Sequence, residues 1–416
     1  HPTLFENSVL NKLLIIKTHF SNYKLSFTDH LSTNSNDALT LPLIASTLGA
    51  EIIEKHVFLE NRETKYDFYS SISLSLAKDL YDKMKSYHFL LNKKEFICQA
   101  ENDYLNKSYV YPQINSSKKK GSQISIKDLR FKRNLDRGLK ISEFENLIKD
   151  HYLLSIDIVE GEVLKKNHFK KANIGGVIIC RMKSSRLKNK ALLNVGDLSS
   201  IEYCIKNILE FDNIHKVILA TSDHKDDSIL KKHTYNKDVE FFKGDPEDVI
   251  KRLLDVAEKY KLDVIVRITG DSPLRSNKLY NKLLNSHFET GADYTAANDV
   301  PVGMNIEIIN VLALKRLFSL FNKSTPYSEY LSYYFRNNPD YFKLNLVSFN
   351  LSIKSNIRLT IDYKEDLELI NVIEKEFNFC ENKFDVEKVV DFLEKNEAIN
   401  KINSHCQKTY SENSNL

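Results

Sequence analysis

The stretch "IICRMKSSRLKNKALL" spans residues 178–193, and it begins with three apolar residues. Five of the next ten residues are cationic, namely Arg181, Lys183, Arg186, Lys188 and Lys190. The apolar periodicity resumes at Ala191. The stretch therefore predicts a buried strand that ends in a short, positively charged loop.

Strand and helix patterns alternate on both sides of this loop, through residues 172–402. The strand candidates are 176–182, 216–222, 239–244, 264–270, 292–297 and 357–363, with helices expected at 200–211 and 246–260. This alternation predicts an α/β fold with a doubly wound, Rossmann-like sheet. Such sheets bind ligands at the carboxyl ends of their strands, which is where the cationic loop lies.

Cations at that position suit a polyphosphate, because Arg binds phosphate oxygens bidentately and Lys acts as a compact charge. The alternative is a solvated helix start, although helix N-termini favour anions. Asp271 follows the strand candidate 264–270, and Asp362 lies near the end of the candidate 357–363. Magnesium on nucleotide phosphates takes one or two carboxylates, so this pair could hold Mg²⁺. Taken singly, either aspartate is more often a cap or turn residue.

Composition excludes several classes of protein. The 416 residues are 42% apolar, which allows two or three packed domains and argues against disorder. No apolar run approaches the roughly 18 residues of a membrane span. The net charge of +4 and a single cation cluster argue against a nucleic-acid binder. The five cysteines are scattered without a C-x-x-C pair, which argues against a disulfide scaffold or thiolate zinc site and favours the cytoplasm.

The loop "CRMKSSRLKNK" (180–190) resembles that of cytidylyltransferases of the spore-coat-polysaccharide and CMP-sugar-acid synthetase type. That family has Ala-Arg-x-Gly-Ser-x-Arg-Leu-Pro-Gly-Lys at this point. The matching residues are Arg181, Ser184, Arg186, Leu187 and Lys190. Further motifs in family order are "ATSD" (220–223), "GDPEDVIKR" (244–252), "VRITGDSPL" (266–274), "PVGMNIEI" (301–308) and "RLTIDYKEDL" (358–367).

The resemblance implies a nucleotide-diphospho-sugar transferase-like fold that joins CMP from CTP to a sugar acid and releases pyrophosphate. It assigns the triphosphate to Arg181, Ser184, Arg186 and Lys190, and magnesium to Asp271 and Asp362. The catalytic set is Arg181, Arg186, Lys190 and Asp271. Thr221, Ser222 and Asp223 would meet the base or ribose, and Gly303 and Glu307 the sugar.

Three loop residues depart from the family pattern. Lys183 and Asn189 replace glycines, and Lys188 replaces the proline. Asn tolerates the left-handed backbone region that glycine offers, whereas Lys adopts it at a cost. We expect a wider loop in an active enzyme. Another nucleotide or sugar specificity, or a scaffold that has lost catalysis, remains an alternative.

Residues 1–91 predict helices at 8–20, 39–50 and 73–91 and strands at 25–30 and 51–58, the pattern of a β/α barrel rim. "FTDH" (27–30) and "IIEKHVF" (52–58) resemble the last strands of the N-acetylneuraminate synthase barrel. That family condenses phosphoenolpyruvate with an N-acetylhexosamine. The resemblance implies manganese or another divalent metal on His30 and His56, with Glu54 and Asp67 near the sugar. The early barrel strands are missing, so we expect a truncated TIM barrel in a fragment that begins at His1.

Residues 92–171 predict a small β-rich module without a visible internal repeat. Residues 103–171 resemble the antifreeze-like (SAF) domain that follows this barrel. In that family a loop arginine reaches the active site of the partner protomer. Arg133 or Arg137 is the candidate here, so we expect a homodimer. The polar end, 403–416, predicts a disordered tail.

Overall fold

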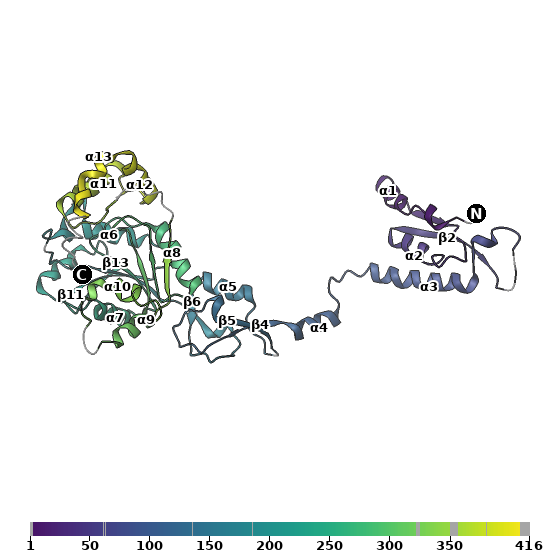
Figure 1. Ribbon diagram of the computed structural model, residues 1–416, viewed down its shortest axis with the longest axis horizontal. Coiled ribbons are helices and arrows are strands. Elements are labelled where there is room, and N and C mark those ends of the chain that lie inside the picture. Colours follow the sequence, from purple (N-terminus) through teal and green to yellow (C-terminus); the bar gives the residue numbers. More distant parts are fainter. Residues whose placement is uncertain are drawn as a thin grey trace. The chain divides into compact units, whose positions relative to one another are not determined.

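The computed structural model describes residues 3–60, 62, 64–134, 136–184, 186–321, 325–349, 357–379 and 381–407. The chain divides into two compact units, His1–Leu105 and Asn106–Leu416 (Figure 1). The sequence predicts domain boundaries after residues 91 and 171, whereas the single division between these two units falls within helix α4 (Gln99–Ser108). No described helix is both long and apolar enough to cross a membrane.

In the described residues of the second unit, a seven-stranded sheet has the order β12-β11-β8-β13-β15-β14-β16. Its strands are β8 (Ile174–Ile179), β11 (Lys216–Ser222), β12 (Val239–Gly244), β13 (Val264–Thr269), β14 (Tyr294–Ala297), β15 (Glu307–Asn310) and β16 (Leu344–Val347). Only β15 runs antiparallel to its neighbours among these strands. Because β11 and β13 flank β8 on opposite sides, the chain reverses direction across the sheet at β8, where ligands bind in open α/β sheets.

Helices cover both faces of the sheet, which confirms the predicted α/β fold. Helices α6 (Ser200–Leu209) and α8 (Asn277–Thr290) cover one face, and α7 (Val249–Tyr260) and α9 (Val311–Ser319) the other (Figure 1). Alternate residues of β13 enter the two cores: Val264 and Val266 pack toward α8, and Ile265 packs toward α7.

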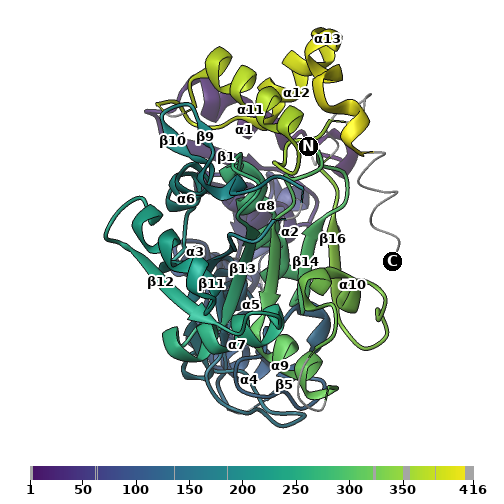
Figure 2. The ribbon, with the colours of Figure 1, turned by 90° about the vertical axis from the view of Figure 1, so that its left-hand side faces the viewer.

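A third apolar cluster lies beside α6. It joins α11 (Lys364–Phe377), α12 (Val386–Lys395) and the hairpin of β9 (Asn194–Val195) and β10 (Leu198–Ser199). Two further short helices of this unit are α10 (Leu331–Arg336) and α13 (Glu397–Asn400). Helices α11, α12 and α13 lie together beyond α6 in both views (Figures 1 and 2).

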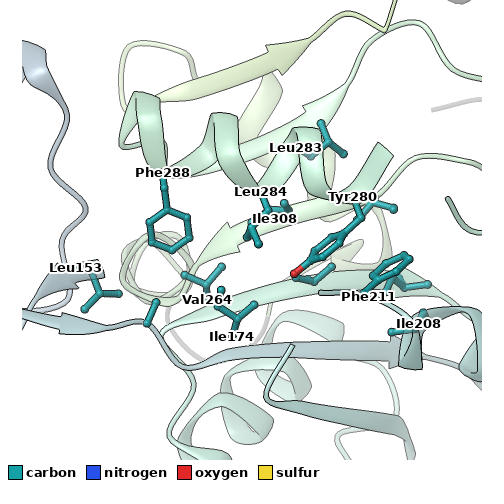
Figure 3. Packing of buried hydrophobic residues seen from close by; sticks show 14 of the residues in the cluster. Leu153, Ile174, Ile208, Phe211, Val264, Tyr280, Leu283, Leu284, Phe288 and Ile308 are labelled. Carbon is teal, nitrogen blue, oxygen red and sulfur yellow. The ribbon is translucent and has the colours of Figure 1, made fainter. Parts of the chain in front are cut away.

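The small module contains β4 (Val110–Ile114), β5 (Leu129–Arg133), α5 (Ile141–Lys149), β6 (Tyr152–Leu154) and β7 (Phe169–Lys171). Leu153 of β6 shares a core with Ile174 and Phe288, so the module and the sheet form one unit (Figure 3). The module has a short internal repeat that the sequence analysis missed. Gly121 and Gly161 both adopt positive φ, and each precedes a 3-10 turn and a strand. The equivalent side chains differ too much for the repeat to stand out in the sequence.

In the first unit β1 (Leu25–Asp29), β2 (Ala50–Phe58) and β3 (Ser71–Ser73) form a parallel sheet. They alternate with α1 (Asn11–His19), α2 (Thr40–Thr47) and α3 (Leu74–Leu91), near the predicted positions. Several apolar side chains are exposed, including Leu14, Ile15, Ile52 and Val57. Exposed apolar surface of this extent is typical of a face that other protein covers.

Two predictions near the C-terminus are wrong. Residues 357–363 do not form a strand of the sheet, because only Arg358 makes a bridge, to Val302, and Leu359 and Ile361 instead pack against α11 and α12. The predicted tail is ordered through residue 407, because buried Asn403 donates to Asp366 and to the Arg358 carbonyl. The rest of the tail, 408–416, lies outside the described residues.

Candidate active site

The cationic loop borders a cavity of about 670 Å³ at the carboxyl end of β8. All five residues assigned to the triphosphate and to catalysis line it: Arg181, Ser184, Arg186, Lys190 and Asp271. Ser185 lies outside the described residues. Side chains predicted from the loop and from the end of β13 therefore line the same cavity.

Asp362 forms ion pairs with three cationic side chains at the edge of this cavity. Its Oδ1 accepts hydrogen bonds from Arg186 Nη2 at 2.7 Å and from Lys190 Nζ at 2.9 Å. Its Oδ2 accepts from Arg358 Nη2 at 2.6 Å. The Asp362 side chain is 6% exposed, so these ion pairs are shielded from solvent. One carboxylate therefore fixes the positions of two cations of the loop.

Lys190 joins Asp362 to Asp271, because its Nζ also donates to Asp271 Oδ2 at 2.9 Å. Burial alone would raise the pKa of Asp271, but the charge and hydrogen bond of Lys190 outweigh it and hold that pKa at about 2. Burial alone would lower the pKa of Lys190, but the two carboxylates raise it. Lys190 and Asp271 are therefore both charged at neutral pH.

The two aspartates differ in how well they fit a magnesium ion. Asp271 lines the cavity and its side chain is 28% exposed, so a carboxylate oxygen can reach a metal beside bound phosphates. Both oxygens of Asp362 already accept from cations, and its side chain faces away from solvent. The donor chemistry fits Asp271 as a ligand, whereas Asp362 fits a role in positioning cations.

The residues assigned to the base or ribose do not line the cavity. Thr221 Oγ1 and Ser222 Oγ donate to Asp227 Oδ2 at 2.9 and 2.5 Å, and Asp227 Oδ1 accepts from the Met182 amide at 2.7 Å. These contacts tie the start of the loop to β11. The side chain of Asp223 is exposed beyond them. Asp227 was missed, because its position in a polar run gives no sign of its long-range partners.

Gly303 and Glu307, assigned to the sugar, also lie behind the cavity wall. Gly303 has φ +93°, and a Cβ there would lie 2.7 Å from backbone atoms of Leu359. Buried Glu307 pairs with Arg267 and accepts from Tyr294 Oη at 2.5 Å. Arg267 does line the cavity, so Glu307 acts on the site through Arg267.

Several residues of the cavity wall were not predicted as site residues, among them Arg252, Arg267, Glu329 and Tyr330. Arg252 is held by the Asp245 carbonyl, which accepts from its Nε at 2.9 Å. Glu329 accepts from Arg181 Nη2 at 3.0 Å. Arg252 and Arg267 fall inside the motifs at 244–252 and 266–274, so the signal was present, whereas Glu329 and Tyr330 had none.

The loop substitutions have a mild effect on the backbone. Asn189 adopts the left-handed conformation, with φ +56°, as its residue type predicted. Lys183 is not among the described residues with positive φ, so the loss of the family glycine there carries no such cost.

In the first unit, the rings of His30 and His56 lie with their centroids 5.1 Å apart. Glu54 is on β2, and Asp67 adopts a left-handed conformation before β3. Among the described residues, no third His, Cys, Asp or Glu joins this pair within a metal-ligand distance; the one such group of three is elsewhere.

Cys98, Cys180, Cys204 and Cys406 are free thiols, and Cys380 lies outside the described residues. In the second unit, Arg133 is exposed at the end of β5, and Arg137 is exposed in the loop after it.

Both parts of the chain match known protein families. Residues 176–399, more than half of the chain, match the family described as "Cytidylyltransferase", and residues 1–95 match the "NeuB family". An uncharacterized protein of Methanocaldococcus jannaschii is 33% identical over 240 residues, which cover 57% of this chain and 97% of that protein. The spore coat polysaccharide biosynthesis protein SpsF of Bacillus subtilis is 30% identical over 202 residues, 47% of this chain and 84% of its own.

A solved structure of another cytidylyltransferase is also similar to this part of the chain. A cytidylyltransferase from Leptospira borgpetersenii superimposes with a TM-score of 0.51 at 27% identity, over 55% of this chain and 97% of its own. The motifs, the doubly wound sheet and the cationic cavity at the end of β8 fit the same assignment. The chain belongs to the cytidylyltransferase family.

Proposed function

We propose that the second unit transfers CMP from CTP to a sugar acid and releases pyrophosphate. The observation that carries this proposal is the cation cluster on Asp362, which presents Arg186 and Lys190 to the cavity beside Asp271. Membership of the cytidylyltransferase family supports the reaction class, and the similarity to SpsF supports a role in polysaccharide synthesis.

The chain's own residues would act mainly by binding and charge stabilisation. Arg181, Arg186 and Lys190 now pair with carboxylates, and phosphate oxygens of CTP would replace some of these partners. A hydroxyl of the acceptor would attack the α-phosphorus in line and release its proton to solvent, while the bond from that phosphorus to the α,β-bridging oxygen breaks and pyrophosphate leaves. Magnesium held by Asp271 would neutralise charge on the phosphates.

The acceptor would lie against Arg267. The Arg267 guanidinium is buried and lines the cavity. It is oriented by Glu307 and by the Glu329 carbonyl, which accepts a hydrogen bond from Arg267 Nη2 at 3.0 Å. A planar, fixed guanidinium suits a carboxylate, which a sugar acid has and a neutral sugar lacks. Gly303 and Glu307, which lie behind the cavity wall, would therefore affect the sugar through the residues of that wall.

For the first unit, we propose a portion of a sugar-acid synthase that condenses phosphoenolpyruvate with an N-acetylhexosamine. The NeuB family match and the His30–His56 pair support this. The pair would hold manganese or another divalent metal, with Glu54 and Asp67 near the sugar. A homodimer in which Arg133 or Arg137 serves the partner remains a prediction.

Calorimetry with CTP tests the assignment of the cation cluster. Arg186→Ala should weaken CTP binding by roughly 1.5–3 kcal/mol, the range for a hydrogen bond to a charged group. Lys188→Ala is the matched control, because Lys188 is an exposed cation of the same loop that does not line the cavity. Equal CTP affinity in the Arg186 variant and wild type would contradict the assignment of Arg186 to the triphosphate. Tighter binding of another nucleotide would favour a different nucleotidyltransferase.

A further inference from the structure

The C-terminal segment, defined here as residues 400–407, packs on the network that holds Asp362. Asn403 is 1% exposed, and its Nδ2 donates to Asp366 Oδ1 at 2.8 Å. Arg358 Nη1 donates to Gln407 Oε1 at 3.0 Å, and Arg358 also pairs with both Asp362 and Asp366. The position of this segment therefore bears on the carboxylate that gathers the catalytic cations.

Three potential metal ligands meet where this segment crosses the start of α11. Glu365 Oε1 lies 3.9 Å from His405 Nε2, and Cys406 Sγ lies 3.7 Å from the same nitrogen. All three ligand atoms lie within 4.8 Å of one another. The 3.9 Å separation is too long for a hydrogen bond. Ligand atoms around a tetrahedral zinc ion lie about 3.3–3.6 Å apart, given its usual bond lengths, so small side-chain movements would suffice.

A simpler interpretation is an exposed ion pair of Glu365 and His405 beside the buried thiol of Cys406. Glu365 and His405 are partly exposed, so their pairing alone would add little stability. Cys406 is only 2% exposed, and it brings a soft sulfur to the two harder donors. Thiolate and imidazole together select zinc over magnesium or calcium. The scattered cysteines gave no hint of this site, because Glu365 lies far from Cys406 in the sequence.

We propose that Glu365, His405 and Cys406 bind a zinc-class divalent ion that fastens the C-terminal segment to α11. Three protein ligands leave a fourth position for water. None of the three lines the catalytic cavity, so the ion would act on the fold of this segment and not on a bound nucleotide. Through Asn403 and Gln407 it would hold Arg358, and therefore Asp362, in place.

Cobalt(II) titration of the reduced, metal-free full chain tests this site. A thiolate-to-cobalt charge-transfer band requires a cysteine ligand, which the His30–His56 pair lacks. We expect the band in wild type, its loss in Cys406→Ser, and its retention in Cys98→Ser, which changes a free thiol of the first unit. Glu365→Gln should keep the band but weaken cobalt binding at least tenfold.

A second measurement does not depend on the cysteine variant folding. Zinc should slow backbone hydrogen exchange of residues 400–407 in wild type, because the ion fastens this segment. Circular dichroism would check that each variant is folded. The absence of a charge-transfer band in folded wild type, an equal band in Cys406→Ser, or exchange in 400–407 that zinc leaves unchanged would each overturn the proposal.

Discussion

Asp362 holds two cations of the site from the edge of the cavity, and its position depends on residues that do not line the cavity. Its partner Arg358 makes a backbone bridge to Val302, next to Gly303. The Leu359 amide donates to the Val302 carbonyl at 2.7 Å. The backbone at Gly303 therefore fixes where Arg358, and with it Asp362, can lie.

Gly303→Ala should lower the free energy of unfolding by about 2–5 kcal/mol, the sum of a left-handed backbone cost and overpacking. The added Cβ would meet rigid backbone of Leu359. Gly161→Ala is the control: Gly161 has φ +84°, but its near neighbour is the flexible end of Arg130, so only the backbone cost of about 1–2 kcal/mol applies. Urea unfolding followed by circular dichroism measures both. Equal losses in the two variants would contradict the close packing at Gly303.

Asp362→Asn separates a positioning role from a metal-ligand role. Buried Arg358 keeps its ion pair with Asp366 in this variant, so we expect a loss of about 2–3 kcal/mol of unfolding free energy, below the usual cost of breaking a buried ion pair. Asp223→Asn, at an exposed aspartate, should change little. If Asp362→Asn kept wild-type stability and changed only the magnesium requirement of the enzyme, Asp362 would be a metal ligand.

At the scale of single elements, the strands around the cationic loop could be predicted because their apolar residues run continuously or alternate. Five of the six candidates are strands of the sheet. The sixth, 357–363, has a strand-like pattern, but its side chains find their core against α11 and α12 rather than beside another strand. Periodicity shows which residues are buried and cannot show what buries them. Arg181, Arg186 and Lys190 were identified from one local motif, whereas Asp227 and Glu329 depend on distant partners.

Helix α8 carries a buried histidine that should make the fold sensitive to acid. Burial, with a smaller effect of His151, lowers the pKa of His287 to about 3. The folded chain therefore leaves the imidazole neutral between about pH 3 and 6.5, where the unfolded chain protonates it. The resulting stability is fully present above pH 6.5 and is lost as the pH falls toward 3.

Between pH 7 and pH 5 this linkage should cost wild type about 2 kcal/mol of unfolding free energy. His287→Gln removes the titration and keeps a group that can bond to Thr295 Oγ1, the present partner of His287 Nδ1 at 2.9 Å. His151 is present in both proteins. Urea unfolding at the two pH values should therefore show a smaller acid loss in the variant, and an equal loss would show that His287 does not titrate as described.

At the scale of the whole molecule, the chain joins a cytidylyltransferase to a NeuB family segment. The two proposed reactions would follow one another, because a synthase that makes a sugar acid would supply the acceptor that a cytidylyltransferase activates. The sequence motifs predicted this pairing. They could not predict that the small module shares the core of the cytidylyltransferase, since that depends on long-range packing of Leu153 and Phe144 with the sheet.

The central claim is that the cavity at the end of β8 joins CMP to a sugar acid. The most direct measurement is mass spectrometry of the products formed from each nucleoside triphosphate, with magnesium and a set of sugar acids and matching neutral sugars. We predict a CMP adduct from CTP and an acid, and its near loss in Asp271→Asn, because the amide lacks the charge that holds magnesium. Adducts that form equally well with neutral sugars or from another nucleotide, or no adduct with any acid, would contradict the account.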